Sequence, residues 1–392
     1  MSDVRMVKLG DLCEHVHKID PHNTPDMHFK YIDIGSVDNH HKKLKDVSTF
    51  TGITAPSRAR QVVLPGDIVV STVRPNLNAI AILPHLEKKY IASTGFSVLR
   101  ISEQITAKYV FYYLQSKRFI HSMINLATGA SYPAVTDKTI KSHLVPIPSL
   151  EEQKRIVTIL DKAKSIQEAR ERQLAALDEL ASSIFEEEIA CKEWNTVSLS
   201  SIVSKLGSGS TPKGGSAAYK NVGTSLIRSM NIHDGRFKAD GLAFIDDEQA
   251  EKLKGVTVEP DDVLINITGA SVTRVTRAPK EYLPARVNQH VCIIRPIPET
   301  IHPVILENYL LNSKIKNKLL KLAKAGATRE AISKTKLANF PVPLVDQESQ
   351  DSYLNKVNNI YIKKSLISDS LEMEKQLSLS LKTYFFSYKG YK

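Results

Sequence analysis

The stretch VPIPSLEEQKRIVTILDKA, residues Val145–Ala163, marks a change in the character of the chain. It begins with apolar residues and prolines, which are typical of the end of a strand, and leads into a segment with neither Gly nor Pro from Glu151 to Ile189. Ala, Leu, Glu, Lys, Arg and Gln dominate this segment, and all six favour helices. The sequence therefore predicts one helix over 151–189, with a length of ~57 Å.

A second segment of the same kind occupies residues 346–392. Both segments carry apolar residues at heptad positions: Ile156, Ile159, Ala163, Ile166, Leu177, Leu180 and Ile184 in the first, and Tyr353, Val357, Ile360, Ile367, Leu371, Leu381 and Phe385 in the second. Helices this long exceed the core of a domain of ~150 residues, so their apolar stripes should pack together as a coiled coil. We expect an antiparallel pair, because the second helix must run back toward the first domain. The alternative is two independent helices, each packed on its own domain.

The region before each long segment looks like a copy of the other. Ile32 in KYIDIGSV lies 195 residues before Ile227 in SLIRSMNI, and the same separation relates Pro65 to Pro260, Arg100 to Arg295, and Pro146 and Pro148 to Pro341 and Pro343. The separation is 190 for Val7 and Leu9 against Val197 and Leu199, and 197 for Gly129–Ser131 against Gly326–Thr328. These matches indicate a tandem duplication with small loop insertions.

The duplication and the long segments together predict an α+β fold with a pseudo-twofold internal repeat. We expect a first domain over 1–150, a long central helix over 151–189, a second domain over 190–345 and a distal long helix over 346–392. Short β-branched runs separated by Gly and Pro predict strands within each domain.

Charge and composition restrict the class of protein. The chain of 392 residues has 53 Lys and Arg against 42 Asp and Glu, a formal net charge of +11, which favours a polyanionic partner such as nucleic acid. No stretch approaches the ~18 apolar residues of a membrane helix, so we expect a cytoplasmic protein with no membrane partner. Cys13, Cys191 and Cys292 are too scattered for a disulfide framework or a metal knuckle.

The common catalytic motifs are missing from the sequence. In KLGSGSTPKGGS, residues 205–216, Gly209 and Gly214 have the spacing of a phosphate-binding loop, but Gly215 stands where that loop needs Lys. No Gly-x-Ser-x-Gly, His-Glu-x-x-His or Asn-Pro-Pro-aromatic motif occurs. Histidines that could bind a metal lack further ligands near them in sequence, which favours a solvated surface: His15, His17, His40 and His41. We therefore predict a chain without catalytic residues, bound metal or bound cofactor.

The remaining candidates are basic and amide side chains that follow strands or lie in Gly-containing loops. Arg can bracket guanine, Asn can bracket adenine, and Lys or Thr beside glycine backbone suits phosphate. The predicted DNA-binding residues are Arg58, Arg60, Arg74, Asn76 and Lys138 in the first half, and Thr211, Lys213, Arg228, Asn231, Arg274, Arg277, Arg329 and Lys334 in the second. For any one of them a solvated surface is the competing interpretation.

Three stretches resemble one known family, the specificity subunits of type I restriction-modification systems. They are GDIVVSTVRPN at 66–76, GSGSTPKGG at 207–215 followed by SLIRSMNI, and above all VPIPSLEEQKRIVTILDKA at 145–163. With the duplication, the resemblance covers essentially the whole chain. It departs from the family at Thr24–Pro25, where the first half lacks the Gly-Ser-rich arm, and at FPVPLVDQESQ, where the Glu-Gln pair is displaced.

The resemblance implies two tandem target-recognition domains separated by two long antiparallel helices, with each domain reading one half of a bipartite double-stranded DNA target. It also implies two partner adenine methyltransferase subunits, which bind S-adenosylmethionine, and optionally two restriction subunits, which use ATP and Mg. The helices would set the spacer between the half-sites and dock the methyltransferase.

Two alternatives come from other classes: a coiled-coil scaffold that binds only protein, and a DNA-modifying enzyme that acts alone. The half-site sequences and the spacer length cannot be derived from the sequence.

Overall fold

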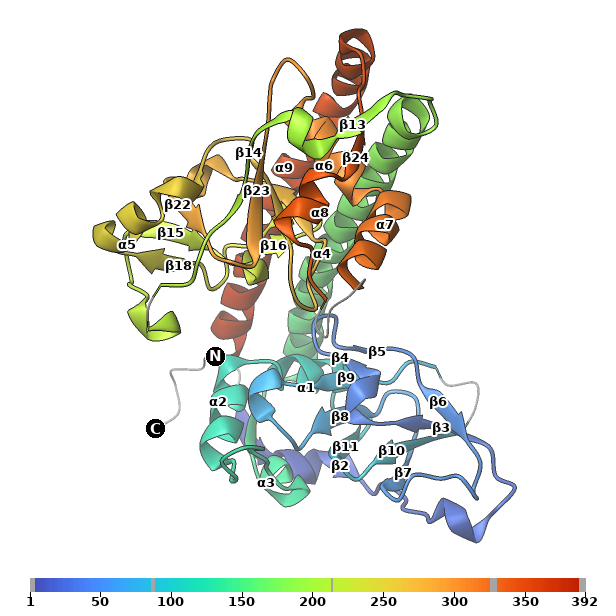
Figure 1. The fold of residues 1–392 in the computed structure, drawn as a ribbon. Coiled ribbons are helices and arrows are strands. Elements are labelled where there is room, and N and C mark those ends of the chain that lie inside the picture. Colours follow the sequence, from blue (N-terminus) through green and yellow to red (C-terminus); the bar gives the residue numbers. More distant parts are fainter. Residues whose placement is uncertain (1–3, 86–88, 213, 325–329, 388–392) are drawn as a thin grey trace. The chain divides into compact units, whose positions relative to one another are not determined.

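The computed structural model describes residues 4–85, 89–212, 214–324 and 330–387, and the chain divides into two compact units (Figure 1). Unit 1 comprises residues 1–171 and 368–392, and unit 2 comprises residues 172–367. Each long helix therefore contributes one part to each unit. Among the described residues, no helix combines the length and the apolar content needed to cross a membrane.

Unit 1 is built on two four-stranded sheets, in the orders β2-β11-β8-β9 and β6-β3-β10-β7, with the strand pairs β1-β12 and β4-β5 beside them. Its strands are β1 Arg5–Lys8, β2 Cys13–Glu14, β3 Phe29–Ile32, β4 Val37–Asp38, β5 Lys43–Leu44, β6 Ser48–Phe50, β7 Ala59–Val63, β8 Ile68–Ser71, β9 Ile80–Ile82, β10 Tyr90–Ser93, β11 Phe96–Ile101 and β12 Leu144–Ile147. Its helices are α1 Ala107–Tyr113, α2 Lys117–Leu126 and α3 Asp137–Lys141, with parts of α4 and α9.

Unit 2 repeats this topology with the sheets β14-β23-β20-β21 and β18-β15-β22-β19 and the pairs β13-β24 and β16-β17. Its strands are β13 Thr196–Ser198, β14 Val203–Ser208, β15 Thr224–Ile227, β16 Ile232–His233, β17 Arg236–Phe237, β18 Ala243–Ile245, β19 Thr257–Val258, β20 Val263–Asn266, β21 Val275–Arg277, β22 Ala285–Val287, β23 Val291–Pro296 and β24 Pro341–Pro343. Its helices are α5 Asp247–Lys252, α6 Pro303–Leu311, α7 Ser313–Lys324 and α8 Lys334–Ala338.

A buried ion pair recurs at the predicted separation of 195 residues. Arg100 on β11 donates Nε to Asp67 Oδ1 at 3.0 Å and Nη2 to Asp67 Oδ2 at 2.8 Å. Arg295 on β23 makes the same two bonds to Asp262, at 2.7 and 2.9 Å. Each aspartate also accepts a backbone N–H three residues before it, and the two are 2% and 1% exposed. A bidentate Arg–carboxylate pair has a fixed geometry, so its recurrence shows that the two copies correspond residue by residue at this separation.

The predicted pairing of the prolines is wrong. Val7 pairs with Val145 in β1-β12, whereas Val197 pairs with Val342 in β13-β24. Pro146 therefore corresponds to Pro343, at a separation of 197, and not to Pro341. The insertion that changes the register lies before these strands.

The same separation of 197 residues explains the displaced Glu-Gln pair of the second half. Gln153 is 1% exposed; its Nε2 donates to Pro148 O and its Oε1 accepts from the backbone N–H of Thr106. Gln350 makes the corresponding bonds to Val345 O and from the N–H of His302. Gln350 thus takes the place of Gln153. Each long helix has one buried glutamine that fixes its start.

The two long helices are continuous, with α4 over Leu150–Phe185 and α9 over Gln347–Phe386, and the α+β class with two such helices is confirmed. A π-helical turn, Glu186–Ala190, follows α4. In unit 1 the first part of α4 contacts the last part of α9, since Gln167 Nε2 donates to Glu374 O at 2.8 Å. In unit 2 the end of α4 contacts the beginning of α9, where the Phe185 and Tyr353 rings meet edge to face at 5.7 Å. Both contacts require antiparallel helices.

The apolar stripe is less completely buried than predicted. Tyr353, Val357 and Ile360 are at most 6% exposed, but Ile166 and Leu180 are 41% and 48% exposed. The long helices thus bury their ends in the two domain cores and leave part of the heptad positions open to solvent.

Candidate nucleic-acid interface

Backbone hydrogen bonds join three loops of unit 1 into one edge. Thr72, after β8, donates its N–H to Gly95 O at 2.9 Å and accepts from Val135 N–H at 2.8 Å, and Arg74 donates its N–H to Pro133 O at 2.7 Å. These bonds place the loop after β8 between the β10-β11 turn and the loop before α3. We call these loops edge 1: residues 72–78, 94–95 and 128–136.

Four of the predicted residues lie on edge 1 or beside it. Arg74 and Asn76 are exposed, and so are Arg58, whose carbonyl accepts from Thr94 N–H, and Lys138 at the start of α3. The Arg74 guanidinium stacks over the Tyr132 ring, 4.8 Å from its centroid, and Tyr132 is 68% exposed. Among the described residues no carboxylate forms an ion pair with Arg58 or Arg74. Their charges are therefore available to an external anion or base edge.

The backbone of Arg74 is in the left-handed conformation, with φ 49°. Non-glycine residues pay about 1–2 kcal/mol for this conformation. The equivalent residue of unit 2 is Gly269, which has φ 77° and makes the same bond, donating its N–H to Glu330 O at 2.9 Å. Glycine adopts this conformation without that cost, so the backbone is strained at Arg74 in unit 1 and relaxed at Gly269 in unit 2.

The equivalent edge of unit 2 is built from the same backbone bonds. Ile267 donates its N–H to His290 O at 2.9 Å and accepts from Ile332 N–H at 2.8 Å. We call these loops edge 2: residues 209–212, 267–273, 288–290 and 330–333. It carries different side chains: Thr211 Oγ1 contacts Gln289 Oε1, and Gln289 Nε2 lies 3.1 Å from His290 Nε2.

Lys334, at the start of α8, extends edge 2 along a groove. The groove has a volume of about 640 Å³, follows the edge strand β14 and is lined also by Lys205 and Ser208. Two lysines with serine and glycine backbone beside them suit a phosphodiester backbone. Thr211 and Lys334 are therefore the two described candidates of unit 2 that lie at edge 2.

Four predicted residues have internal roles instead. Arg60 pairs with Asp20 at 3.3 Å, and Arg277 donates Nε at 2.7 Å to Glu307, which is 4% exposed. Asn231 is fully buried; its Oδ1 caps Arg228 N–H and its Nδ2 donates to Lys238 O. Arg228 lies over the Tyr219 ring and donates to Gly241 O. These contacts hold loops together, and we do not assign base contacts to Arg60, Arg228, Asn231 and Arg277.

Arg274 lies in the β20-β21 loop, and its neighbour is a histidine. Burial lowers the pKa of His233, and the charge of Arg274 lowers it further. Arg274 is partly exposed, but its loop position is not that of Arg74 in unit 1, because 195 residues separate it from Ala79. Two further candidates, Lys213 and Arg329, lie outside the described residues.

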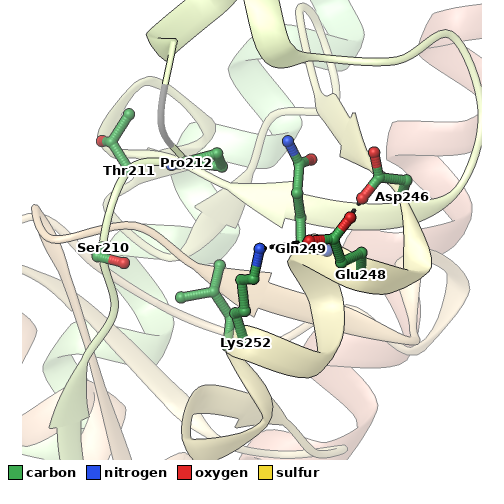
Figure 2. A pocket seen from close by; sticks show the side chains of 8 residues that line it. Ser210, Thr211, Pro212, Asp246, Glu248, Gln249 and Lys252 are labelled. Carbon is green, nitrogen blue, oxygen red and sulfur yellow. Dashed lines mark hydrogen bonds and ion pairs between the residues drawn. The ribbon is translucent and has the colours of Figure 1, made fainter.

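A second pocket, of about 470 Å³, lies between the glycine-rich arm and α5 (Figure 2). Figure 2 shows Thr211 and Pro212 on one side and Asp246 and Glu248 on the other. Among the described residues that line it, Lys252 is the only lysine, and it is paired with Glu248 at 2.5 Å. The carboxylates Asp246 and Glu248 outnumber this lysine in the described lining, which does not suit phosphate and agrees with the lack of a phosphate-binding motif in the sequence.

Sequence reasoning missed Tyr132, Gln289 and His290. The repeat held a signal for the last two, because Thr94 and Gly95 precede them by 195 residues, in the turn that borders Arg58 and Arg74. It also missed a group of possible metal ligands: the structure brings Glu171 to His40 and His41, with ligand atoms within 4.8 Å of one another.

Comparison with known proteins identifies the class. The sequence profile described as type I restriction modification DNA specificity domain matches residues 1–178 and again 191–372, so the chain belongs to this family. The resemblance inferred from the sequence is thereby confirmed, and the chain contains the DNA specificity domain of this family twice.

Particular relatives agree with this assignment. The chain is similar to the specificity subunit of the type I restriction enzyme HindI of Haemophilus influenzae, 24% identical over 189 residues, 47% of this chain and 40% of the relative. It is also similar to the MjaIX specificity subunit of Methanocaldococcus jannaschii, 23% identical over 123 residues, 31% of this chain and 28% of the relative. The alignments thus span less than half the length of these relatives.

Two solved structures match over nearly the full chain. One comes from work on complex assembly and conformational transition of a type I restriction-modification system, with 25% identity, a TM-score of 0.55, and 98% of this chain and 97% of that chain covered. The other is the S subunit of a type I system from M. genitalium, with 14% identity, a TM-score of 0.56 and coverage of 98% and 96%, and it supports the fold alone.

Proposed function

We propose that the two units read the two halves of a bipartite double-stranded DNA target, unit 1 through edge 1 and unit 2 through edge 2. One observation carries the proposal: the same three backbone hydrogen bonds build both edges, but the exposed side chains differ. Arg58, Arg74 and Asn76 suit guanine and adenine in the major groove, whereas Thr211 and Gln289 offer a different set of donors and acceptors. Two edges with the same backbone hydrogen bonds but different exposed side chains are suited to two different half-sites.

Phosphate contacts would supply much of the affinity, and they would make binding depend on salt. We propose this role for Lys138, which is exposed beside edge 1, and for Lys205 and Lys334, which line the groove beside edge 2. Each good bidentate contact to a base would add about 1–3 kcal/mol of discrimination.

The long helices are proposed to set the spacer and to dock the methyltransferase subunits. Within unit 1, α9 carries three exposed apolar side chains on one face: Met373 at 64%, Leu377 at 57% and Tyr384 at 77% exposure. These residues are four and seven apart, which is the spacing of one side of a helix. A solvated helix face of this kind is typical of a protein-binding surface.

In this proposal the chain itself is not catalytic and binds no cofactor. Two methyltransferase subunits carry S-adenosylmethionine, and two restriction subunits, where they are present, use ATP and Mg. The chain contributes recognition and spacing. Methyl incorporation by the purified chain alone, given S-adenosylmethionine and DNA, would overturn this part.

The test is a map of methylated adenines in a host with the partner methyltransferase, with and without this chain. We expect a bipartite motif that disappears when the chain is absent. In a second strain, residues 4–145 are replaced by the same region of a relative, while residues 194–340 stay as a matched internal control. One half-site should change and the other should remain; a change in both halves by a folded chimera would contradict independent reading.

A further inference from the structure

A pocket of about 200 Å³ in unit 1 is lined by the β4-β5 hairpin, the end of α1, the first part of α4 and the last part of α9. Four lysines line it, namely Lys42, Lys164, Lys375 and Lys382, together with the two carboxylates Glu168 and Glu171. No residue of edge 1 lines it, although Lys42 reaches the carbonyl of Asn78 at the end of edge 1.

The carboxylates of the pocket already have basic partners. Lys43 holds Glu168 at 2.8 Å, and Lys375 lies 3.8 Å from Glu171. His41 Nε2 is 3.5 Å from Glu171 as well, while its Nδ1 bonds Asp38 at 2.8 Å.

The other three lysines have only neutral acceptors. Lys42 Nζ donates to Asn78 O at 2.6 Å, Lys164 Nζ to His41 O at 3.3 Å and Lys382 Nζ to Gln115 Oε1 at 3.0 Å. Within the described part of the chain, none of the three forms an ion pair with a carboxylate. Partly buried cations are normally paired, because a charge loses hydration when it leaves water.

Burial lowers the pKa of all three lysines. For Lys382, burial and the charges of Lys42 and Lys164 together lower the pKa to about 8. Burial likewise lowers the pKa of Lys42 to about 8 and depresses that of Lys164. A ligand with negative charge would relieve both the desolvation and the repulsion.

The repeat places a carboxylate in unit 2 at a position near this pocket in unit 1. The backbone N–H groups of Thr106 and His302 bond the equivalent glutamines, so five residues later Phe111 on α1 corresponds to Glu307 on α6. Glu307 neutralises Arg277 through a bond of 2.7 Å. Unit 1 has the Phe111 ring at this place, with Lys164 Nζ 5.9 Å from its centroid. Unit 1 thus has an aromatic ring beside Lys164 where unit 2 has a carboxylate.

We propose that this pocket binds a small tetrahedral oxyanion of the sulfate and phosphate class, held by Lys42, Lys164 and Lys382. The volume accommodates such an ion with its remaining hydration water. A metal ion at His40, His41 and Glu171 is a less favourable occupant of the same region, because Lys164 and Lys375 approach these groups and repel a cation. The bound anion would tie the β4-β5 hairpin to both long helices.

The first test is calorimetric titration of the full chain with sodium sulfate, against sodium chloride at equal ionic strength. We expect one sulfate site and no chloride site. Lys164→Met and Lys382→Met each remove one charge-assisted hydrogen bond and should weaken sulfate binding by about tenfold or more. Lys45→Met, on an exposed lysine that does not line the pocket, is the matched control and should bind like the wild type. Absence of a sulfate site, or equal binding by all three variants, would overturn the proposal.

The second test inserts the carboxylate that unit 2 contains. Phe111→Glu should place an internal anion beside Lys164, so sulfate affinity should fall by about tenfold or more while the circular dichroism spectrum is retained. A folded Phe111→Glu variant with unchanged sulfate affinity would overturn the proposal. Competition by a short duplex distinguishes the source of the anion: displacement of sulfate indicates a DNA phosphate, and no displacement indicates a free ion; either result supports an oxyanion site.

Discussion

Arg74 combines a strained backbone with an exposed, stacked guanidinium. A substitution at this position can therefore distinguish a role in DNA binding from a role in folding stability. Replacement by Gly, the residue of unit 2, relieves the left-handed strain but adds freedom to the unfolded chain. We expect Arg74→Gly to leave the free energy of unfolding unchanged or to raise it by up to about 1 kcal/mol. Binding of target DNA by the complex assembled with the methyltransferase should nevertheless weaken by about 1–3 kcal/mol, as expected for one lost bidentate contact.

The matched control is Arg5→Ala, which removes an exposed arginine from β1. Its DNA affinity should match that of the wild type once the salt concentration is held fixed. If Arg74→Gly bound target and non-target duplexes as the wild type does, Arg74 would have to be removed from the interface.

His143 makes the stability of unit 1 sensitive to acid at a position where unit 2 has no titratable side chain. Its ring is partly buried against Phe119, with Nε2 2.9 Å from Tyr113 Oη, and burial lowers its pKa to about 4. The folded-state pKa is thus below the ordinary value of about 6.5. The unfolded chain takes up a proton below pH 6.5, while the folded chain takes it up only near pH 4. Stability from the neutral ring is therefore present above pH 6.5 and lost as the pH falls toward 4.

The equivalent residue in unit 2 is Phe340, because Leu9 and Leu199 donate to the carbonyls of His143 and Phe340. The free energy of unfolding of the wild type should fall between pH 6.5 and pH 4.5. In His143→Phe we expect this fall to be smaller by about 2 kcal/mol, as measured by urea unfolding. His121→Phe, at an exposed position on α2, should keep the pH dependence of the wild type. An unchanged slope in His143→Phe would show that other groups cause the acid sensitivity.

For single residues, the sequence predicted which side chains are exposed better than it predicted what they contact. The sequence pattern predicts DNA contacts for Arg74 and Lys138 because they follow a strand and a glycine loop, and both are exposed in the structure. Arg277 and Asn231 satisfied the same rule, but their partners are Glu307, 30 residues away, and backbone carbonyls that only the folded loop brings close. A pattern of residue types cannot distinguish a base-reading arginine from one with a distant internal carboxylate.

Among the elements, the long helices were the easiest to predict, because the absence of Gly and Pro over 151–189 leaves few alternatives. Their burial was harder. A heptad pattern predicts that every apolar position faces a partner, yet Ile166 and Leu180 are exposed. The heptad pattern identifies apolar side chains on one face of the helix. It does not show whether the surface that covers them belongs to the same chain or to another protein.

The exposed face of α9 leads to a prediction about assembly. Met373→Glu and Leu377→Glu each place a charge in the proposed methyltransferase contact, which should weaken binding of that subunit by about 2 kcal/mol or more through desolvation. The control is Thr383→Glu, on another side of the same exposed segment. Co-purification or calorimetry with the partner methyltransferase measures the effect. Equal assembly by all three variants would place the docking site elsewhere.

For the whole molecule, the proposed role of the helices as a ruler can be tested by lengthening both. Within unit 1, α4 and α9 meet at Arg170 and Glu374, 3.3 Å apart, and within unit 2 they meet at Asp178 and Lys364. Four helix-forming residues added after Glu171 and four added after Ile367 keep each of these contacts within its own unit. Each insert lengthens its helix by ~6 Å and turns it ~40° beyond one full turn.

At ~3.4 Å per base pair, an extension of 6 Å corresponds to one or two base pairs, so the half-sites should keep their sequences while the unread spacer grows by that amount. Adenine-methylation mapping in cells with each variant is the measurement. Glycine-rich inserts of the same length are the control, because they interrupt the helices and should blur the spacing instead of shifting it. An active complex with helical inserts and an unchanged spacer would mean that the helices do not set the distance, since every other element of both units would be the same as in the wild type.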